Sequence, residues 1–328
     1  MVTVRRFVQG ACFVLASVGF GSTTTAHAQA FPPGVIRIVV PTPPGTPPDI
    51  ISRVVAAQIA ATEGWRIVVE NKPGALQTVG MAEVLRQPAD GLTIYPMSVP
   101  TMAVPALLPH MGLRPDVDFA PVAKVSKSFN VLVVTPSFPV RTIAELVSAL
   151  KHEPGKFNFS SAGFGTPAHL IGEMFKLQNN VQAAHIPYQQ AQQRIGDLLT
   201  GINHFDFLAS VSASDFIASG KLRALAVTSP DRVIGLNDVP SVVEQGFPGL
   251  IVEDYVGFAV RSGTSPEIVG RLNGAVNNAL KQPSVREAFA TLGAEPAGGS
   301  SAEFGDLIKS QVAHWGRVVR DSGIKLSQ

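Results

Sequence analysis

The sequence predicts an α/β fold made of two lobes, each built around a mostly parallel sheet. The chain has 328 residues, room for two domains of about 150 residues each, and 45% of them are hydrophobic, as a globular core requires. β-Branched runs alternate with segments of helical period, a pattern typical of parallel strands joined by helices. The alternation comes in two series, one before and one after residues 91–113, which indicates two lobes.

The first series contains two strands and two helices. The strands are predicted at 35–40 and 66–70, and the helices at 50–61 and 79–85. The strands are rich in Val and Ile, and the helices repeat apolar residues every three to four positions. A strand, a helix and a second strand in this order form the unit that builds parallel sheets.

The second series continues the same alternation and ends in helices. Strands are predicted at 130–135, 157–160, 183–187 and 222–228, with helices at 143–151, 169–177 and 192–200 between them. Three further helices are predicted at 265–280, 285–292 and 302–322. We expect these last helices to return and cover the first lobe.

Residues 91–113 lie between the two series and contain no charged side chain. Prolines stand at 96, 100, 105 and 109. Because each proline removes a backbone donor and clashes with the preceding turn, we expect them to break any helix here. The segment is therefore predicted to be a buried or cleft-facing connection and not a membrane span.

Residues 1–28 have the pattern of a secretory signal. It consists of a basic pair at 5–6, an apolar stretch at 7–20 and a small-residue cleavage site at 26–28. Cleavage is expected after Ala28 or, as the second choice, after Ala30, and twin-arginine export is an alternative use of the basic pair. The apolar stretch is shorter than the ~20 residues that span a bilayer, so we expect a periplasmic protein that does not itself span the membrane.

The predicted leader also decides the charge and thiol content of the exported chain. Arg5 and Arg6 are two of 26 basic residues, so the remaining 24 match the 24 acidic ones. A neutral chain without a basic run is not expected to bind nucleic acid. Cys12 is the single cysteine and lies inside the apolar stretch, so its removal would exclude disulfides, cysteine nucleophiles and cysteine-bound metals.

A glycine-rich turn at 161–166 follows the strand predicted at 157–160 and precedes a helix. Gly163, Gly165 and Ala168 match a relaxed dinucleotide fingerprint, but no acidic residue stands at 185–189, where that fingerprint needs one. The turn is therefore interpreted as a backbone site for a carboxylate or phosphate at a helix N-terminus. A dinucleotide site and a turn without any ligand are the alternatives.

A similar strand-to-helix turn opens the exported chain at 41–49. Asp49 is predicted to be the N-cap of the helix that follows, because its carboxylate accepts free N–H groups there. Ligands of open α/β sheets bind at the carboxyl ends of strands. We therefore expect the two turns, one from each lobe, to face each other across a ligand.

The sequence offers little that predicts catalysis. It contains no Gly-x-Ser-x-Gly elbow, and the histidines at 110, 152, 169, 185, 204 and 314 lack metal-ligand spacing. We therefore predict no catalytic residue, no metal and no cofactor. A periplasmic small-molecule hydrolase is kept as an alternative, because Ser160, Ser161, Thr166 and His169 lie close in sequence.

The chain resembles the substrate-binding receptors of tripartite tricarboxylate transporters, often called Bug-type receptors. The resemblance covers nearly the whole exported chain. It is carried by Pro-Pro-Gly at 43–45 with Asp49, Val-Glu-Asn-Lys-Pro-Gly-Ala at 69–75, Pro-Ala-Asp-Gly at 88–91, Asp-Phe-Ala-Pro-Val at 118–122, Asn-Val-Leu-Val-Val at 130–134, Pro-Gly-Lys at 154–156, Gly-Thr at 165–166 with His169, Ile-Pro-Tyr at 186–188, Gly-Lys-Leu-Arg-Ala-Leu-Ala-Val-Thr at 220–228, Asp-Val-Pro at 238–240 and Leu-Gly-Ala-Glu-Pro at 292–296. The shared order and spacing make the match specific.

The resemblance implies a type II periplasmic binding protein, with two Rossmann-like lobes, a two-crossing hinge and a ligand cleft between them. The first lobe is expected to comprise 31–127 and 255–328, and the second 128–254. Such a receptor is not an enzyme: it closes on a small carboxylate-bearing solute and delivers it to the integral-membrane permease subunits. We expect a monomer, and a sensor that presents its closed form to a signalling partner is an alternative.

The resemblance also implies the residues that contact the solute. They are Pro44, Gly45, Thr46 and Asp49 in the first turn, Ser161, Ala162, Gly163, Gly165 and Thr166 in the second, His169 as a support of the second turn, and Asp206 as the acidic contact. The chain departs from the family pattern at Thr46, where a second glycine is usual, and at Pro48, where Thr or Ser is usual. It also has Leu76-Gln77 where Gly-Gly is common.

Overall fold

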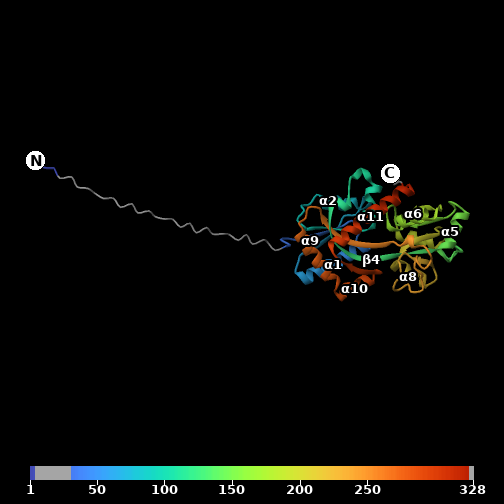
Figure 1. Ribbon diagram of the computed structural model, residues 1–328. Helices are drawn as coiled ribbons and strands as arrows, with labels where there is room; N and C mark the ends of the chain where they lie inside the picture. The colour runs from blue at the N-terminus through green and yellow to red at the C-terminus, as the bar shows by residue number, and fades with distance from the viewer. Residues whose placement is uncertain (4–30, 325–328) are drawn as a thin grey trace. The chain divides into compact units, whose positions relative to one another are not determined.

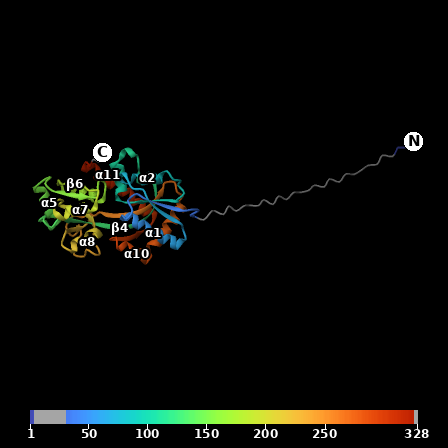
Figure 2. The same cartoon turned by 180° about the vertical axis from the view of Figure 1, so that it is seen from behind.

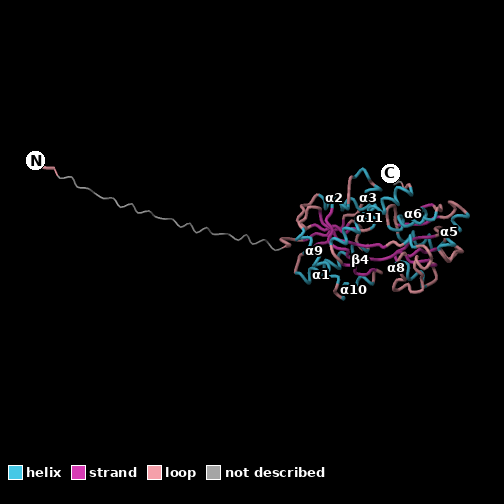
Figure 3. Tube along the Cα trace, in the orientation of Figure 1, coloured by secondary structure: helices cyan, strands magenta, loops and turns pink. Residues whose placement is uncertain are grey.

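The computed structural model describes residues 1–3 and 31–324. Contacts divide the chain into Met1–Ala30 and Phe31–Gln328, and every described helix and strand lies in the second unit. The predicted leader and Cys12 lie outside the described residues, apart from residues 1–3. Figure 3 shows the second unit as strands flanked by helices.

The strands form one curled sheet in the order β2-β1-β3-β9-β4-β7-β5-β6, with β8 and β10 also paired to β4. Their bounds are β1 Ile36–Val40, β2 Ile67–Asn71, β3 Thr93–Met97, β4 Phe119–Val134, β5 Asn158–Ser161, β6 Ala184–Pro187, β7 Phe205–Ala209, β8 Arg223–Val227, β9 Glu253–Arg261 and β10 Ala294–Gly298. The groups β2-β1-β3 and β6-β5-β7 are parallel, whereas the strands predicted at 130–135 and 222–228, which are β4 and β8, pair antiparallel with each other. The strands between them pair antiparallel, because β4 and β9 carry the chain from one group to the other and back.

Helices cover both faces of the sheet. Their bounds are α1 Pro47–Glu63, α2 Thr78–Leu85, α3 Val99–Leu107, α4 Pro115–Asp118, α5 Ile143–His152, α6 Pro167–Asn179, α7 Ala191–Thr200, α8 Ser210–Ala218, α9 Pro266–Leu280, α10 Pro283–Ala290 and α11 Ser301–Ser322. Every predicted element is present with bounds that differ by three residues at most, except β4, which begins earlier than predicted. Figures 1 and 2 show β4 between α1 and α10 on one side and α5 and α8 on the other.

The hydrogen-bond partners of β4 change part of the way along the strand. Residues up to Phe129 pair with β9, whereas residues from Asn130 pair with β7. A single strand thus belongs to both halves of the sheet, which is the arrangement a two-crossing hinge needs. The lobe division at 127/128 and 254/255 stays a prediction, since 31–328 forms one compact unit.

The final helix needs a correction to its predicted position. Helices α9 and α10 pack on α1, as expected for helices that cover the first lobe, but α11 packs on both α3 and α6. Its side chain Trp315 is fully buried in a core that also contains Val39 of β1 and Phe175 of α6. Apolar side chains of α11 pack against elements from both halves of the sheet, so this helix joins the two halves of the molecule.

The prediction that residues 91–113 contain no helix is wrong. β3 and the nine-residue helix α3 lie there, and α3 contains both Pro100 and Pro105. Pro100 stands in the first turn, where a missing N–H breaks no helical bond, and a capping box formed by Ser98 and Thr101 fixes the start. Burial holds this short helix in place despite Pro105. In residues 31–324, no helix has both the length and the apolar character needed to cross a bilayer.

Candidate ligand-binding site

The parallel strands bring two sets of helix starts to two sheet edges. β1, β2 and β3 end near α1, α2 and α3, while β5, β6 and β7 end near α6, α7 and α8. Carboxyl ends of parallel strands are where open α/β sheets bind ligands. Both predicted turns lie at such ends, with 41–46 following β1 and 162–166 following β5.

The first turn starts α1 in a different way from the one predicted. Thr46, and not Asp49, is the N-cap, and Asp49 lies in the first turn of the helix. The Gly45 N–H donates to the Asp49 carboxylate at 2.9 Å, and the Thr46 hydroxyl donates to the Pro43 carbonyl at 2.7 Å. Asp49 therefore fastens the turn from inside the helix. Pro44 and Gly45 are exposed.

The second turn starts α6 with Thr166 as its N-cap. The Gly165 N–H donates to His169 Nδ1 at 3.0 Å, and the Thr166 hydroxyl donates to the Gly163 carbonyl at 2.7 Å. His169 thus supports the turn from its helix. Gly163 has a φ of 119°, and a methyl group added there would meet no atom within 4 Å, so this side of the turn is open.

The two turns are the same structural unit built twice. Each reads Gly-Thr-Pro, with Gly45 and Gly165 in the left-handed region at φ values of 81° and 72°. In each, the glycine N–H donates to the side chain four residues later, which is Asp49 in the first turn and His169 in the second. No internal repeat is evident from the sequence alone, because only this three-residue match marks the unit.

His185 is a residue behind the second turn that sequence reasoning missed. Its Nε2 lies 2.6 Å from the Ser161 hydroxyl, and its ring lies 4.2 Å from that of His169, centroid to centroid. Phe164 contacts both imidazoles edge-on. The signal was weak: His185 stands in β6 beside Phe159 of β5, and only the parallel pairing brings it near Ser161.

The two imidazoles under the second turn are neutral. Burial lowers the pKa of His169 to about 4, with a further contribution from the positive charge of Lys176. Burial also lowers the pKa of His185 to about 3, assisted by His169, Lys176 and Arg194. The turn is therefore backed by groups that carry no charge near neutral pH.

Asp206 is fully buried and lies behind the second turn. Its carboxylate forms a two-point ion pair with Arg194 and accepts a hydrogen bond from the Ser160 hydroxyl. Burial raises the pKa of Asp206, and the Arg194 guanidinium opposes this shift. With no exposed surface, Asp206 positions Arg194 and Ser160, and its predicted contact with a solute stays a prediction.

Asp49 has a more open environment than Asp206. It accepts hydrogen bonds from Arg53, whose side chain is 46% exposed, and from Asn71 at the end of β2. Although burial raises the pKa of Asp49, hydrogen bonds from Arg53, Gly45 and Asn71 bring it below its ordinary value. Asp49 is therefore an anion at neutral pH.

The second turn contacts the first group of elements directly. A methyl group added to Gly165 would lie 2.8 Å from Leu76 Cδ2 and 3.3 Å from Leu107 Cδ1. Leu107 belongs to α3, and Leu76 belongs to the short segment between β2 and α2. The two sheet edges thus meet at Gly165, where a glycine permits the close approach.

The segment that carries Leu76 has an unusual backbone. Ala75, Leu76 and Gln77 have consecutive φ values of 43°, 55° and 74°, a left-handed conformation that costs a non-glycine residue about 1 kcal/mol. The Gln77 side chain holds the segment in place, because its Oε1 accepts from Thr101 at 2.8 Å and its Nε2 donates to Ser98 at 3.2 Å. This strained segment presents Leu76 to the second turn.

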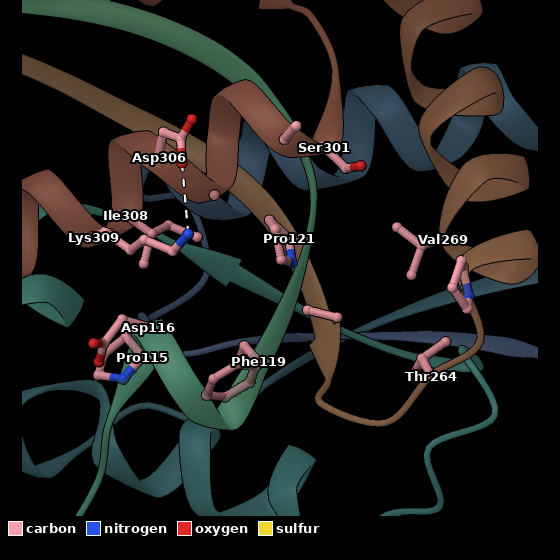
Figure 4. Close-up of a pocket in the computed structure, with 14 residues that line it drawn as sticks. Pro115, Asp116, Phe119, Pro121, Thr264, Val269, Ser301, Asp306, Ile308 and Lys309 are labelled. Atoms are coloured by element: carbon pink, nitrogen blue, oxygen red, sulfur yellow. Dashed lines mark ion pairs between the residues drawn. The ribbon is translucent and has the colours of Figure 1, made fainter.

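A separate cavity of about 430 Å³ lies near the start of β4 and α11, away from both turns. Figure 4 shows Phe119, Pro121, Val269 and Ile308 around it, with an ion pair between Asp306 and Lys309. None of the predicted ligand residues lines this cavity. Within the described part of the chain, no group of three metal-ligating side chains is close enough to hold a metal ion.

The curled sheet, with the second turn packed at Gly165 against Leu76 and Leu107 of the other half, is the fold of periplasmic binding proteins. Solved structures of this class match the fold closely. One described as a periplasmic transporter has a TM-score of 0.78, 36% identity and 91% coverage of this chain against 100% of its own. MatC (Rpa3494) from Rhodopseudomonas palustris, solved with bound malate, has a TM-score of 0.76 and 29% identity, covering 88% of this chain and 100% of its own. Rpa4515 of R. palustris, solved with adipate, has a TM-score of 0.77 and 29% identity, covering 90% of this chain and 99% of its own.

The chain belongs to the family of tripartite tricarboxylate transporter receptors, whose family model matches residues 51–324. A relative from Pseudomonas sp. strain P51, a UPF0065 protein in the tcbD-tcbE intergenic region, is 33% identical over 96% of this chain and 95% of its own length. Protein BugT of Bordetella pertussis is 32% identical over 93% of this chain and 94% of its own. The predicted family resemblance is thereby confirmed, and the chain is a member of a solute-receptor family.

Proposed function

We propose that this protein is an extracytoplasmic receptor for a small carboxylate-bearing solute. It is exported with the leader 1–28, binds the solute between the two turns, and delivers it to the permease subunits of a tripartite tricarboxylate-type transporter. Family membership supports this proposal, as do the malate and adipate bound by two structural relatives.

The observation that supports the proposal most is the construction of the second turn. Ser161, Gly163 and Gly165 are fixed by hydrogen bonds to one another and to His169, while the Gly163 side remains open. A helix N-terminus with positive dipole follows at once. Rigid N–H donors at such a terminus bind an anionic group without any reorganisation.

The proposed mechanism is closure about the two strand crossings, β4 and β9. A solute held on the second turn gains its remaining contacts only when the first group of elements approaches, as it does at Gly165 and Leu76. Its higher affinity for the closed form shifts the equilibrium toward closure. Residues 31–127 with 255–328 and residues 128–254 are the two bodies proposed to move.

Isothermal titration calorimetry with mono-, di- and tricarboxylates tests the proposal. At least one carboxylate is expected to bind, and Gly163→Ala is expected to weaken it at least ten-fold, because the methyl group would occupy the open side of the turn. Gly263→Ala is the matched control: Gly263 also has a positive φ, 93°, with only an ordinary contact to Ala89. The absence of heat and of any melting shift with every carboxylate would contradict the proposal.

A hydrolase is the second candidate, and one observation favours it. Ser161 Oγ lies 2.6 Å from His185 Nε2, within hydrogen-bond distance of a general base. However, the buried Nδ1 of His185 has no hydrogen-bond partner among the described residues, so no third group orients the ring. Ester turnover that disappears in both Ser161→Ala and His185→Gln would support this candidate, and an inert wild type would remove it.

Delivery to a permease distinguishes a transport receptor from a sensor. Capture of membrane proteins by the tagged receptor, with and without solute, is expected to recover multi-span permease subunits. Recovery of a signalling protein in their place would favour the sensor alternative.

A further inference from the structure

The two turns differ in the number of backbone donors they offer. Residues 41–48 and 161–168 are the matched windows when the two Gly-Thr-Pro units are aligned. The first window contains five prolines and the second contains a single proline, and a proline has no N–H to donate. In the first window the Gly45 N–H is also engaged by Asp49. In the second, the N–H groups of Gly163 and Gly165 are engaged, which leaves those of Ala162, Phe164 and Ala168 as donors.

The charges behind the two turns differ in the same direction. The first turn is fastened by the Asp49 carboxylate, an anion close to the start of α1. The second is fastened by His169, which burial keeps neutral. The group that accepts from the glycine N–H is thus an anion in the first turn and neutral in the second, although a paired carboxylate lies near each turn, Asp49 near the first and Asp206 near the second.

Three cations near the turns are already engaged in ion pairs. Arg53 pairs with Asp49, Arg194 pairs with Asp206, and Lys176 pairs with Glu173. A second carboxylate on the solute would therefore have no unpaired cation among these groups to offset the loss of its hydration. These pairs favour a solute with a single negative charge.

The surface that meets the second turn is apolar. Leu76 and Leu107 both lie within contact distance of Gly165, as the positions of their Cδ atoms show. A solute whose carboxylate is held on this turn has these two side chains in its immediate surroundings. Burying the carbon atoms of a solute there lowers the free energy, because they leave water. Burying a hydroxyl or charged group there raises it, because the group loses its hydration and gains no hydrogen-bond partner from these two side chains.

We propose that the solute is a monocarboxylate with an apolar remainder, its carboxylate on the second turn and its carbon chain against Leu76 and Leu107, and that Leu76 is the residue that determines this specificity. The inference rests on the proposed function, since it assigns the substrate class of the same site. It assigns different roles to the two turns: the second binds the anion, and the first closes over the rest of the molecule.

Pairs of probes with equal chain length test the assignment. Calorimetry compares butanoate with succinate, hexanoate with adipate and octanoate with suberate, since each pair differs only in the second carboxylate. In every pair that binds, the monocarboxylate is expected to bind at least ten-fold more tightly. A dicarboxylate that binds as tightly as its partner or more tightly would overturn the inference while leaving the proposed function intact, whereas no binding by any carboxylate would overturn both.

Two variants separate the role of Leu76 from that of its backbone. Leu76→Gly removes the side chain and relieves the left-handed strain, so the variant is expected to fold, which a thermal melt checks. Its affinity for the tightest monocarboxylate is expected to fall about ten-fold, as loss of a buried aliphatic contact implies, with dicarboxylates changed less than three-fold. Ala75→Gly relieves the same kind of backbone strain at the neighbouring residue, and it is expected to change neither the monocarboxylate affinity nor the dicarboxylate affinity. An unchanged ratio of mono- to dicarboxylate affinity in Leu76→Gly would contradict the role of Leu76.

Discussion

The two Gly-Thr-Pro turns have the same hydrogen-bond plan but different support. Behind the second turn lie the buried His169, the half-buried His185 whose ring packs against it at a tilt, and the fully buried Asp206. Behind the first lies Asp49, whose partner Arg53 is 46% exposed. The comparison shows that one backbone design can be fastened in two ways: by a neutral imidazole, or by a carboxylate that is itself 3% exposed but whose ion-pair partner reaches solvent.

Removing the acid behind each turn is expected to give the largest difference between the turns, measured as the loss in the free energy of unfolding. Asp206→Asn leaves the Arg194 guanidinium without its carboxylate in a site where Asp206 is fully buried, so the free energy of unfolding is expected to fall by about 3 kcal/mol. Asp49→Asn removes a pair whose cation is largely hydrated and is expected to cost about 1 kcal/mol. Urea unfolding of both variants measures the difference, and equal losses would refute the contrast in support.

The histidine pair predicts a pH dependence that belongs to the second turn. His169 and His185 have pKa values lowered to about 4 and about 3, so the folded state binds fewer protons than the unfolded state below pH 6.5. Their contribution to stability is therefore complete above that pH and is lost as the pH falls from 6.5 toward 4, by on the order of 3 kcal/mol.

Thermal melts between pH 7.5 and 4 measure this loss. The double variant His169→Gln and His185→Gln is expected to show a shallower decline of the melting temperature over the same range, because neither amide titrates. If the double variant declines as steeply as the wild type, the acid sensitivity comes from other groups.

A methyl group on Gly165 sharpens the comparison at the point of contact. Gly165→Ala would press on Leu76 and Leu107, so closure is hindered and solute affinity is expected to fall about ten-fold. Gly64→Ala is the matched control, since Gly64 has a φ of 70°, close to the 72° of Gly165, and open space around it. Both variants should lose similar thermal stability through backbone strain, but only Gly165→Ala should lose affinity. Equal affinities in the two variants would mean that Gly165 is not at the site of closure.

Much of the fold could be predicted because most elements have a local signal. The parallel strands and their helices follow from apolar period and turn residues, and their bounds agree within three residues. The first part of β4, residues 119–129, was missed because Lys124 and Lys127 interrupt its apolar pattern and its partners β9 and β10 are distant in sequence. α3 was missed because a proline in the first helical turn does not break a helix.

The site was only partly predictable, because only some of its residues have a local signal in the sequence. Both turns were located, since glycine, threonine and proline mark them locally. His169 was predicted as a support of the second turn, but His185 was not, because it lies 24 residues from Ser161 and reaches it only through strand pairing. Leu76 was noticed as a departure from the family pattern, but its contact with Gly165 joins two segments that no periodicity connects.

Helix α11 has a consequence for how this chain acquires its structure during synthesis. Its 22 residues complete an interior that already includes Val39 of β1, the first strand of the fold. Until the ribosome has released this last segment, apolar side chains of α3 and α6 have no cover. The unfinished chain is therefore unable to reach its native state, which agrees with the export proposed above.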